Sequence, residues 1–234
     1  MKVEIWSDIA CPWCYIGRRR FETALEQFEH RDQVEIVWRS FQLDPNASPA
    51  PSGNSFDLLM KKYGMSRQQS VEMHERITML AAEEGLDYRF EGTRPVNSFD
   101  AHRLLHLAAD RGVQGEMKER IQRAYFTEGQ VVSDHETLAR LASEVGLDAA
   151  EVRHMLSGDA YADAVHADIR RAQMIGVTGV PFFVFAEKYA VSGAQPAELF
   201  TTALERAWAD THPVVELISA KDDAPTCTDD SCAV

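Results

Sequence analysis

The stretch SDIACPWCYIGRRRF, residues 7–21, places two cysteines, Cys11 and Cys14, at the start of a predicted helix. The run before it, VEIWS at residues 3–7, is rich in β-branched and aromatic residues and predicts a strand. Pro12 suits the first helical turn, because its missing N–H would have no intrahelical partner there. The cysteine pair is therefore expected at a strand-to-helix junction.

A sulfur at this junction is well placed to act as a nucleophile. It faces free backbone N–H groups and the positive end of the helix dipole, and both favour the thiolate. The dipole contributes about 0.3 to 2 kcal/mol, or about one pKa unit, so an activated thiolate also needs hydrogen bonds to the sulfur. We expect Cys11 to be the exposed nucleophile with a lowered pKa, and Cys14 to be the resolving thiol that attacks a mixed disulfide.

The predicted elements around this motif follow the order βαβ, a helical gap, then ββα. The segment VEIVWRSF, residues 34–41, predicts a second strand parallel to the first. Near the other end, residues 180–194 predict two short strands with a polar turn, and residues 195–209 predict an amphipathic helix. Residues 45–176 are predicted to be helical throughout.

This order predicts an α/β fold in which an all-helical subdomain interrupts a sheet domain. The polar C-terminal segment has the composition of a tail and carries a CxxxxC pair. The expected parts are a discontinuous sheet domain (1–44 and 177–209), a helical insertion (45–176) and a tail (210–234) with Cys227 and Cys232.

The composition is that of an acidic protein with enough apolar residues for a real core. The chain has 234 residues, of which 45% are hydrophobic, and its 24 Lys and Arg against 37 Asp and Glu give a net charge of −13. That charge repels phosphate backbones and anionic bilayers, so we predict no nucleic-acid partner and no membrane partner. With no long apolar run and no leader-like N-terminus, we expect a cytoplasmic protein. In a reducing cytosol, paired cysteines are more often catalytic, redox-sensing or metal-binding than structural.

Two other interpretations of the cysteine pair stay open. A structural zinc site also uses C-x-x-C, and Cys227 with Cys232 would supply a second pair, which would make the protein a metal-binding redox sensor. Two inert cysteines packed in the core are the other alternative. Exchange chemistry is favoured because zinc ligand pairs usually lie on a knuckle, so we assign no metal ligand.

The second informative element is Val180-Pro181, which follows GVTG and begins a predicted strand. Proline within a sheet is confined to strand starts, edges and bulges, so an ordinary trans proline explains it. A cis bond is the functional alternative, although only about one X-Pro bond in twenty is cis.

The combination of CPWC at the first helix and Val-Pro at the third strand resembles the thioredoxin superfamily, and the helical insertion resembles its DsbA group. The segments SDIACPWCYIGRRRFE, NSFDAHRLLHLA and GVTGVPFFVF are similar to the FrnE-like DsbA-family oxidoreductases of the cytosol, and the similarity extends to about residue 209. It implies a thioredoxin fold with a large all-helical insertion and a protein disulfide oxidoreductase or isomerase. In that family the pair matching Cys11 and Cys14 is catalytic, and a cis proline matching Pro181 packs against it. The implied substrate-binding residues are Pro12, Trp13, Val180 and Pro181.

The residue at position 13 bears on the redox poise. Periplasmic DsbA enzymes typically have a histidine where this chain has Trp13, and an imidazolium there stabilises the thiolate. We therefore expect a less oxidising couple, suited to reduction or isomerisation. The expected partners are cysteine-containing protein substrates and a thiol reductant system, with no cofactor other than glutathione as a reductant. The oligomeric state has no signature in the sequence.

A glutathione-dependent isomerase or transferase is the alternative enzyme. The related 2-hydroxychromene-2-carboxylate isomerases and kappa-class glutathione transferases typically have serine at the position of Cys11 and use it to hold the glutathione thiol. A redox-active pair would instead form a mixed disulfide with glutathione and resolve it. The cysteine at this position therefore favours exchange.

The remaining polar residues have simpler interpretations. Cys227 and Cys232 form a possible auxiliary redox pair that relays electrons to the first pair. His102 and His106 lie four apart without the glutamate of an H-E-x-x-H motif, so we interpret them as solvated or half-packed side chains. The arginines at positions 18–20 are interpreted as a solvated basic face, and Asp8 as a hydrogen-bonding loop residue.

Overall fold

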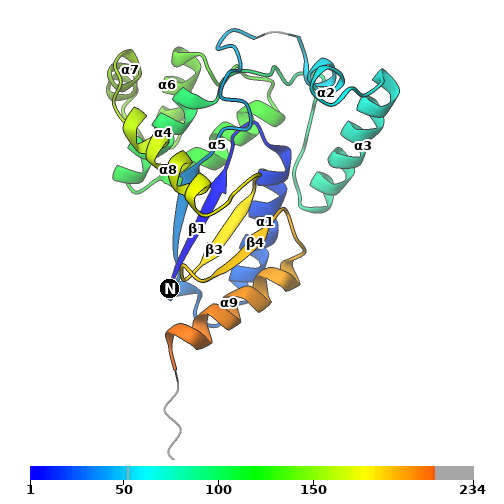
Figure 1. The fold of residues 1–234 in the computed structure, drawn as a ribbon. Coiled ribbons are helices and arrows are strands. Elements are labelled where there is room, and N and C mark those ends of the chain that lie inside the picture. The colour runs from blue at the N-terminus through cyan, green and yellow to red at the C-terminus, as the bar shows by residue number, and fades with distance from the viewer. Residues whose placement is uncertain (52, 214–234) are drawn as a thin grey trace, which may run out of the picture.

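A four-stranded sheet in the order β2-β1-β3-β4 forms the centre of the molecule (Figure 1). The structure is a computed structural model that describes residues 1–51 and 53–213. β1 pairs in parallel with β2, whereas β3 is antiparallel to both β1 and β4. The strands are β1 (Lys2–Ser7), β2 (Glu35–Ser40), β3 (Phe182–Phe185) and β4 (Tyr189–Ser192).

Among the described residues, two α-helices pack beside the sheet and seven lie between β2 and β3 in the chain, and a short 3-10 helix (Arg31–Gln33) precedes β2. The first group is α1 (Pro12–Glu26) and α9 (Ala197–Thr211). The second group is α2 (Ser55–Tyr63), α3 (Arg67–Glu83), α4 (Phe99–Asp110), α5 (Gln114–Phe126), α6 (His135–Glu144), α7 (Ala149–Ser157) and α8 (Ala162–Met174). This βαβ…ββα order with its helical insertion confirms the predicted α/β thioredoxin fold.

The two faces of the sheet are covered by different helices. On one face α1 and α9 pack together, and Phe21 of α1 contacts Phe183 of β3 and Phe200 of α9 with ring centres 5.6 and 5.8 Å apart. On the other face α8 packs against β2, and the indole N–H of Trp6 donates to the carbonyl oxygen of Asp168 at 3.0 Å. The sheet is thus buried on both sides, as its apolar strands require.

The turn of the β3–β4 hairpin has a well-defined backbone conformation. Ala186 and Glu187 have φ angles of 49° and 57°, so both central turn residues lie in the left-handed region. Three residues, 186–188, separate the paired Phe185 and Tyr189, and the Lys188 N–H donates to the Phe185 carbonyl oxygen at 3.0 Å. Positive φ angles at the centre of such a turn match the right-handed twist of the flanking strands. The predicted turn between these strands is therefore confirmed.

The inserted helices build their own apolar core, which continues to the first turns of α1. Tyr15 and Ile16 of α1 are buried in the same cluster as Leu104 of α4 and Ile121 of α5.

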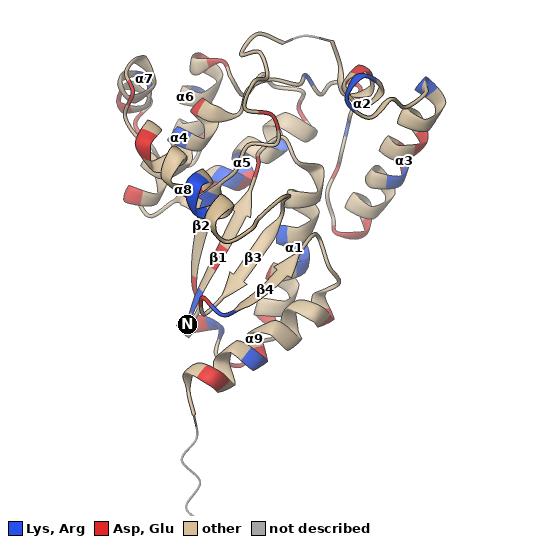
Figure 2. Ribbon diagram, viewed as in Figure 1, with Lys and Arg blue, Asp and Glu red and all other residues tan. Residues whose placement is uncertain are grey.

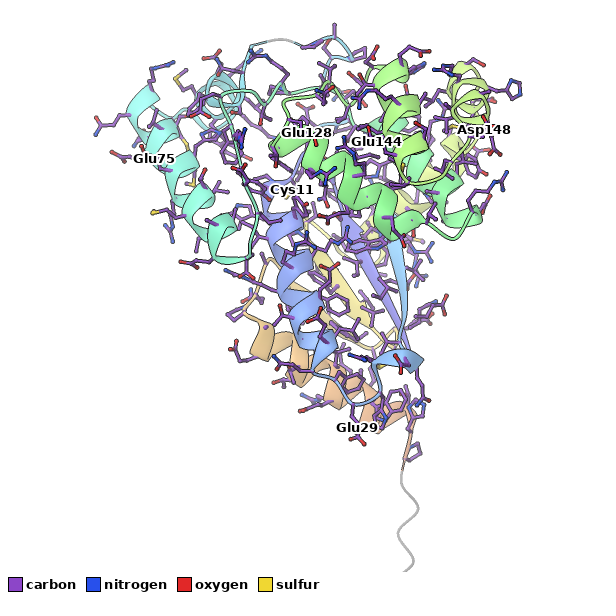
Figure 3. The ribbon with its side chains drawn as sticks, turned by 180° about the vertical axis from the view of Figure 1, so that it is seen from behind. Cys11, Glu29, Glu75, Glu128, Glu144 and Asp148 are labelled. Carbon is purple, nitrogen blue, oxygen red and sulfur yellow. The ribbon has the colours of Figure 1, made fainter. Side chains whose placement is uncertain are left out.

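Acidic and basic residues occur on the same helices, as α3 and α9 show (Figure 2). Of the helices that the structure describes, none has the length and hydropathy to cross a bilayer. Because the first turns of α1 share the apolar core of the inserted helices, the N-terminus of α1 lies where the sheet layer and these helices meet (Figure 3).

Candidate active site

The cysteine pair lies at the N-terminus of α1, as the sequence predicts. Cys11 is the N-cap, with extended backbone angles (φ −93°, ψ 112°), and Pro12 occupies the first helical position. The Cys14 N–H donates to the Cys11 carbonyl oxygen at 3.1 Å, which closes the first turn. Both cysteines are free thiols.

The segment with Pro181 packs directly on this pair. The Val180-Pro181 bond is cis, as the family resemblance implies. The Cys11 thiol donates to the Val180 carbonyl oxygen, with 3.5 Å between sulfur and oxygen. Residues 169 positions apart in the chain therefore meet at the reactive sulfur.

Gly17 allows this close approach, and the sequence analysis did not assign it a role. A Cβ atom at position 17 would lie 2.9 Å from Cγ of Pro181 and 3.3 Å from the Cα atom of Ala194. A glycine inside a helix costs about 1 kcal/mol relative to alanine, so its presence one turn beyond Cys14 signals a packing constraint.

The expectation that Cys11 is exposed and has a lowered pKa is wrong in this structure. Cys11 is only 2% exposed and Cys14 only 1%. The hydrogen bond with the Cys14 thiol, burial and the field of the Asp8 carboxylate together raise the pKa of Cys11 well above its usual range. The hydrogen bond from the Cys14 N–H lowers the pKa of Cys11. The prediction failed because the hydrogen bond with the Cys14 thiol, burial and the nearby Asp8 carboxylate outweigh the one favourable contact at the helix N-terminus, which is the Cys14 N–H.

Asp8 and His102 form a buried pair next to the cysteine motif. Nε2 of His102 lies 3.3 Å from Oδ1 of Asp8, and Oδ2 of Asp8 accepts from the Leu43 N–H at 2.8 Å. Burial opposes the charged form, but the hydrogen bond and charge of His102 and the bond from Leu43 outweigh it and hold the pKa of Asp8 below its usual value. The prediction for Asp8 as a hydrogen-bonding loop residue is confirmed.

The two histidines of α4 are more enclosed than predicted. His102 is fully buried, because its ring fills the space beside Asp8. His106 is partly buried, with Nε2 3.1 Å from Oδ2 of Asp168. Each histidine thus has its own carboxylate partner from a distant part of the chain. The prediction of solvated or half-packed side chains is wrong for His102, which is fully buried, and is confirmed for His106, which is partly buried.

The inserted segment contacts the CPWC motif through Tyr88. The Tyr88 hydroxyl donates to the Pro12 carbonyl oxygen at 2.8 Å, and its ring is buried against Tyr15 and Phe126. Trp13 is half-buried and packs against the same apolar cluster. The inserted helical layer therefore forms one wall of the site.

Comparison with known proteins agrees with this geometry. The family model of the DSBA-like thioredoxin domain matches residues 2–205. The chain belongs to this family. It is 48% identical to a probable DsbA oxidoreductase from Streptomyces coelicolor. The crystal structure of that protein superimposes on this chain with a TM-score of 0.87, and the match covers 100% of this chain and 99% of the other.

Two further relatives are more distant. An uncharacterised protein of Bacillus subtilis (strain 168), YwbO, is 28% identical over 204 residues, covering 86% of this chain and 94% of that protein. A 2-hydroxychromene-2-carboxylate isomerase has the same fold, with a TM-score of 0.69 at 15% identity, covering 90% of this chain and 98% of the isomerase. The isomerase therefore shares the fold of this chain.

The arginines at positions 18–20 of this DsbA-like chain are not a solvated basic face. Each of the three is partly or fully buried and ion-paired, so their charges are neutralised within the protein. The pairs are Arg18–Glu22, Arg18–Glu119, Arg19–Glu22, Arg19–Glu119 and Arg20–Glu84. This surface therefore offers no free cationic patch to an acidic ligand.

The metal-binding hypothesis requires a second cysteine pair in addition to Cys11 and Cys14. Within residues 1–51 and 53–213, no three His, Cys, Asp or Glu side chains are grouped to hold a metal ion. Cys227 and Cys232, the second pair in that hypothesis and the predicted auxiliary redox pair, lie outside the residues that the structure describes.

Proposed function

We propose that this DsbA-like protein is a thiol-disulfide oxidoreductase that works through Cys11 and Cys14. The observation that supports this most is the meeting of two free thiols at a helix N-terminus with the Val180 carbonyl, whose oxygen lies 3.5 Å from the Cys11 sulfur. A reactive pair next to a free backbone segment suits a substrate that binds as an extended peptide.

In the reductive direction, each step exchanges one sulfur–sulfur bond for another. The Cys11 thiolate attacks a substrate disulfide, forms a mixed disulfide and releases the first substrate sulfur, which takes up a proton. The Cys14 thiolate then attacks the Cys11 sulfur, which breaks the mixed disulfide and releases the second substrate thiol. The substrate gains two electrons, and the enzyme is left with a Cys11–Cys14 disulfide that a thiol reductant such as glutathione returns to the dithiol.

The surroundings of Cys11 favour this reductive direction. A strongly oxidising DsbA stabilises its reduced form as a thiolate. Here burial and the Cys14 thiol raise the pKa of Cys11, so the reduced pair gains no such stabilisation at neutral pH. We infer that the Cys11–Cys14 redox couple donates electrons to cysteine-containing proteins or isomerises their disulfides. A cytoplasmic location and an electron relay through Cys227 and Cys232 stay predictions.

A glutathione-dependent isomerase is the second candidate, because the isomerase structure has the same fold over 90% of this chain. That enzyme class would bind reduced glutathione reversibly. Calorimetry with Cys14→Ala distinguishes the two, because an isomerase would retain tight, non-covalent binding of glutathione. Exchange chemistry instead predicts a covalent adduct with glutathione disulfide at Cys11.

The direct test is insulin reduction with glutathione as electron donor. Wild type should be active, whereas Cys11→Ser should be inactive. Cys14→Ser should accumulate a mixed disulfide on Cys11, visible by mass spectrometry. The Cys227→Ser/Cys232→Ser variant serves as a matched control that retains the CPWC pair. Full activity in Cys11→Ser would contradict the proposal.

A further inference from the structure

A pocket of about 460 Å³ lies in the inserted layer, between α2, α3 and the segment that joins α3 to α4 (Figure 1). Pockets of about 300 to 1,000 Å³ are large enough to enclose a small organic molecule. Most of the wall is apolar or aromatic, and it is formed by Phe56, Val71, Met79, Tyr88 and Phe90. The proposed exchange reaction makes no use of this pocket.

One buried polar side chain, His74 of α3, lines the pocket. It is only 5% exposed, and its ring contacts those of Phe56 and Phe90, with ring centres 4.2 and 4.5 Å apart. Nδ1 lies 2.7 Å from the carbonyl oxygen of Ser70, which can only accept, so Nδ1 carries the proton. Burial lowers the pKa of His74, so the ring is neutral at pH 7. Nε2 is therefore an acceptor, and it has no hydrogen-bond partner among the described residues.

Two carboxylates complete the polar part of the lining. They belong to Glu75 of α3, which is labelled in Figure 3, and to Glu91 of the joining segment. Both side chains are exposed, and neither forms an ion pair with a described residue. Within the described chain no lysine or arginine lines the pocket, and the whole protein carries a net charge of −13. The mouth of the pocket therefore favours a positively charged ligand.

We propose that this pocket binds a small organic cation with an aromatic body and an N–H donor. The ring would lie against the apolar wall, the N–H would donate to Nε2 of His74, and the ammonium group would face Glu75 and Glu91. Each of these three requirements comes from one part of the lining, because apolar walls, a lone acceptor and unpaired carboxylates select different groups of a ligand. The proposal does not depend on the exchange chemistry, although Tyr88 in the pocket wall also donates its hydroxyl to the Pro12 carbonyl oxygen.

Tryptamine is the probe for this site, because it combines an indole ring, an indole N–H and an ammonium group. Its binding to the reduced full-length protein is measured by isothermal titration calorimetry at pH 7. Two analogues change one group each: 1-methyltryptamine lacks the indole N–H, and indole-3-propionate has a carboxylate in place of the ammonium group.

The variants remove the same interactions from the side of the protein. His74→Phe keeps an aromatic ring but has no acceptor, and Glu75→Gln/Glu91→Gln removes both charges. Glu83→Gln is the matched control, because it removes an exposed carboxylate of α3 that does not line the pocket. Cys11→Ser tests whether the ligand lies at the cysteine pair instead. Circular dichroism before each titration confirms that the variant is folded.

Wild type should bind one tryptamine per chain with a Kd of about 1 mM or tighter, the affinity usual for a ligand of this size. Binding should weaken by about threefold or more in Glu75→Gln/Glu91→Gln, as expected for the loss of two exposed ion pairs. Indole-3-propionate should bind more weakly still, and Glu83→Gln and Cys11→Ser should match wild type. In wild type 1-methyltryptamine should bind about twofold to tenfold more weakly than tryptamine, the effect of one hydrogen bond, and this difference should disappear in His74→Phe.

Several results would overturn the proposal. They are the absence of saturable tryptamine binding by folded wild type, equal binding by Glu75→Gln/Glu91→Gln and Glu83→Gln, and equal binding of indole-3-propionate and tryptamine. A difference between the two amines that persists in His74→Phe would rule out the hydrogen bond to Nε2. Loss of binding in Cys11→Ser would place the ligand at the cysteine pair. Failure of the exchange function would leave all these titrations unchanged, so the two proposals are tested separately.

Discussion

The substitution Gly17→Ala has two effects of opposite sign on the free energy of unfolding, and the structure predicts which of them is larger. Replacing a glycine inside a helix by alanine stabilises the helix by about 1 kcal/mol. In α1, however, the new methyl group would lie 2.9 Å from Cγ of Pro181 and 3.3 Å from the Cα and Cβ atoms of Ala194. Carbon atoms prefer about 3.5 to 4.0 Å, so the cis-proline segment would have to move by about 0.5 to 1 Å.

Overpacking of this kind costs about 1 to 3 kcal/mol. The Pro181 ring is rigid and the Ala194 contact is partly backbone, so neither neighbour can rotate away and we expect the upper end of that range. Subtracting the helix term leaves a net destabilisation of about 2 kcal/mol. For a chain of this size that corresponds to a decrease in Tm of about 4 to 8 °C.

The assay is urea unfolding of reduced protein, with Gly115→Ala as the matched control. Gly115 is also helical, but a Cβ atom there would meet nothing within 4 Å, so this substitution should be neutral or stabilising. Displacement of Pro181 should also break the Cys11–Val180 hydrogen bond and speed alkylation of Cys11 by iodoacetamide. A Gly17→Ala protein as stable as Gly115→Ala, with unchanged alkylation, would refute the packing argument.

Four further predictions concern the charges and hydrogen bonds of the site. Because the pKa of Cys11 is raised, its alkylation rate should increase about tenfold per pH unit from pH 6 to 9, and a plateau below pH 8 in peptide mass spectrometry would contradict this. Asp8→Asn removes a carboxylate that disfavours the thiolate, so Cys11 alkylation at pH 7 should become faster, whereas an equal or slower rate would show that the field of Asp8 is negligible. The lowered pKa of Asp8 contributes stability that is complete above about pH 4 and is lost as pH falls through the folded-state pKa, so unfolding free energies of wild type should decrease more steeply below pH 4 than those of Asp8→Asn. Tyr88→Phe leaves the Pro12 carbonyl without its donor and should lower the unfolding free energy in urea by about 0.5 to 1.5 kcal/mol, and no decrease would mean that water replaces the hydroxyl.

The parts of the fold that the sequence predicts are those set by local patterns. The helix start at Pro12, the parallel β1–β2 pair and the β3–β4 hairpin all follow from residue type and spacing within short windows. The cis bond before Pro181 required the family resemblance, because a proline at a strand start is ordinarily trans.

The errors arise where the answer depends on residues far apart in the chain. The burial of Cys11 comes from contact with Val180, which no local pattern around CPWC reveals. The arginines beyond the cysteines look like a basic face because their carboxylate partners include Glu84 and Glu119, which come from other helices. Lys118 and Gln122 of α5 are buried polar side chains, and the sequence indicated this burial only weakly, through polar residues that interrupt the apolar positions of the helix one turn apart.

If the proposed exchange function holds, the Val180 carbonyl would connect substrate binding to activation of the Cys11 sulfur. In the free protein this oxygen accepts the Cys11 proton, and a hydrogen bond to the thiol form opposes ionisation. A substrate strand that pairs with Val180 would donate a backbone N–H to the same oxygen and compete with the thiol for it. Cys11 would then lose the acceptor that holds its proton at the moment when a disulfide is beside it. The Cys14 thiol, burial and the Asp8 carboxylate would still raise the pKa of Cys11 after this exchange of partners, so displacement of the Cys11–Val180 bond would remove only one of the contacts that keep the sulfur protonated.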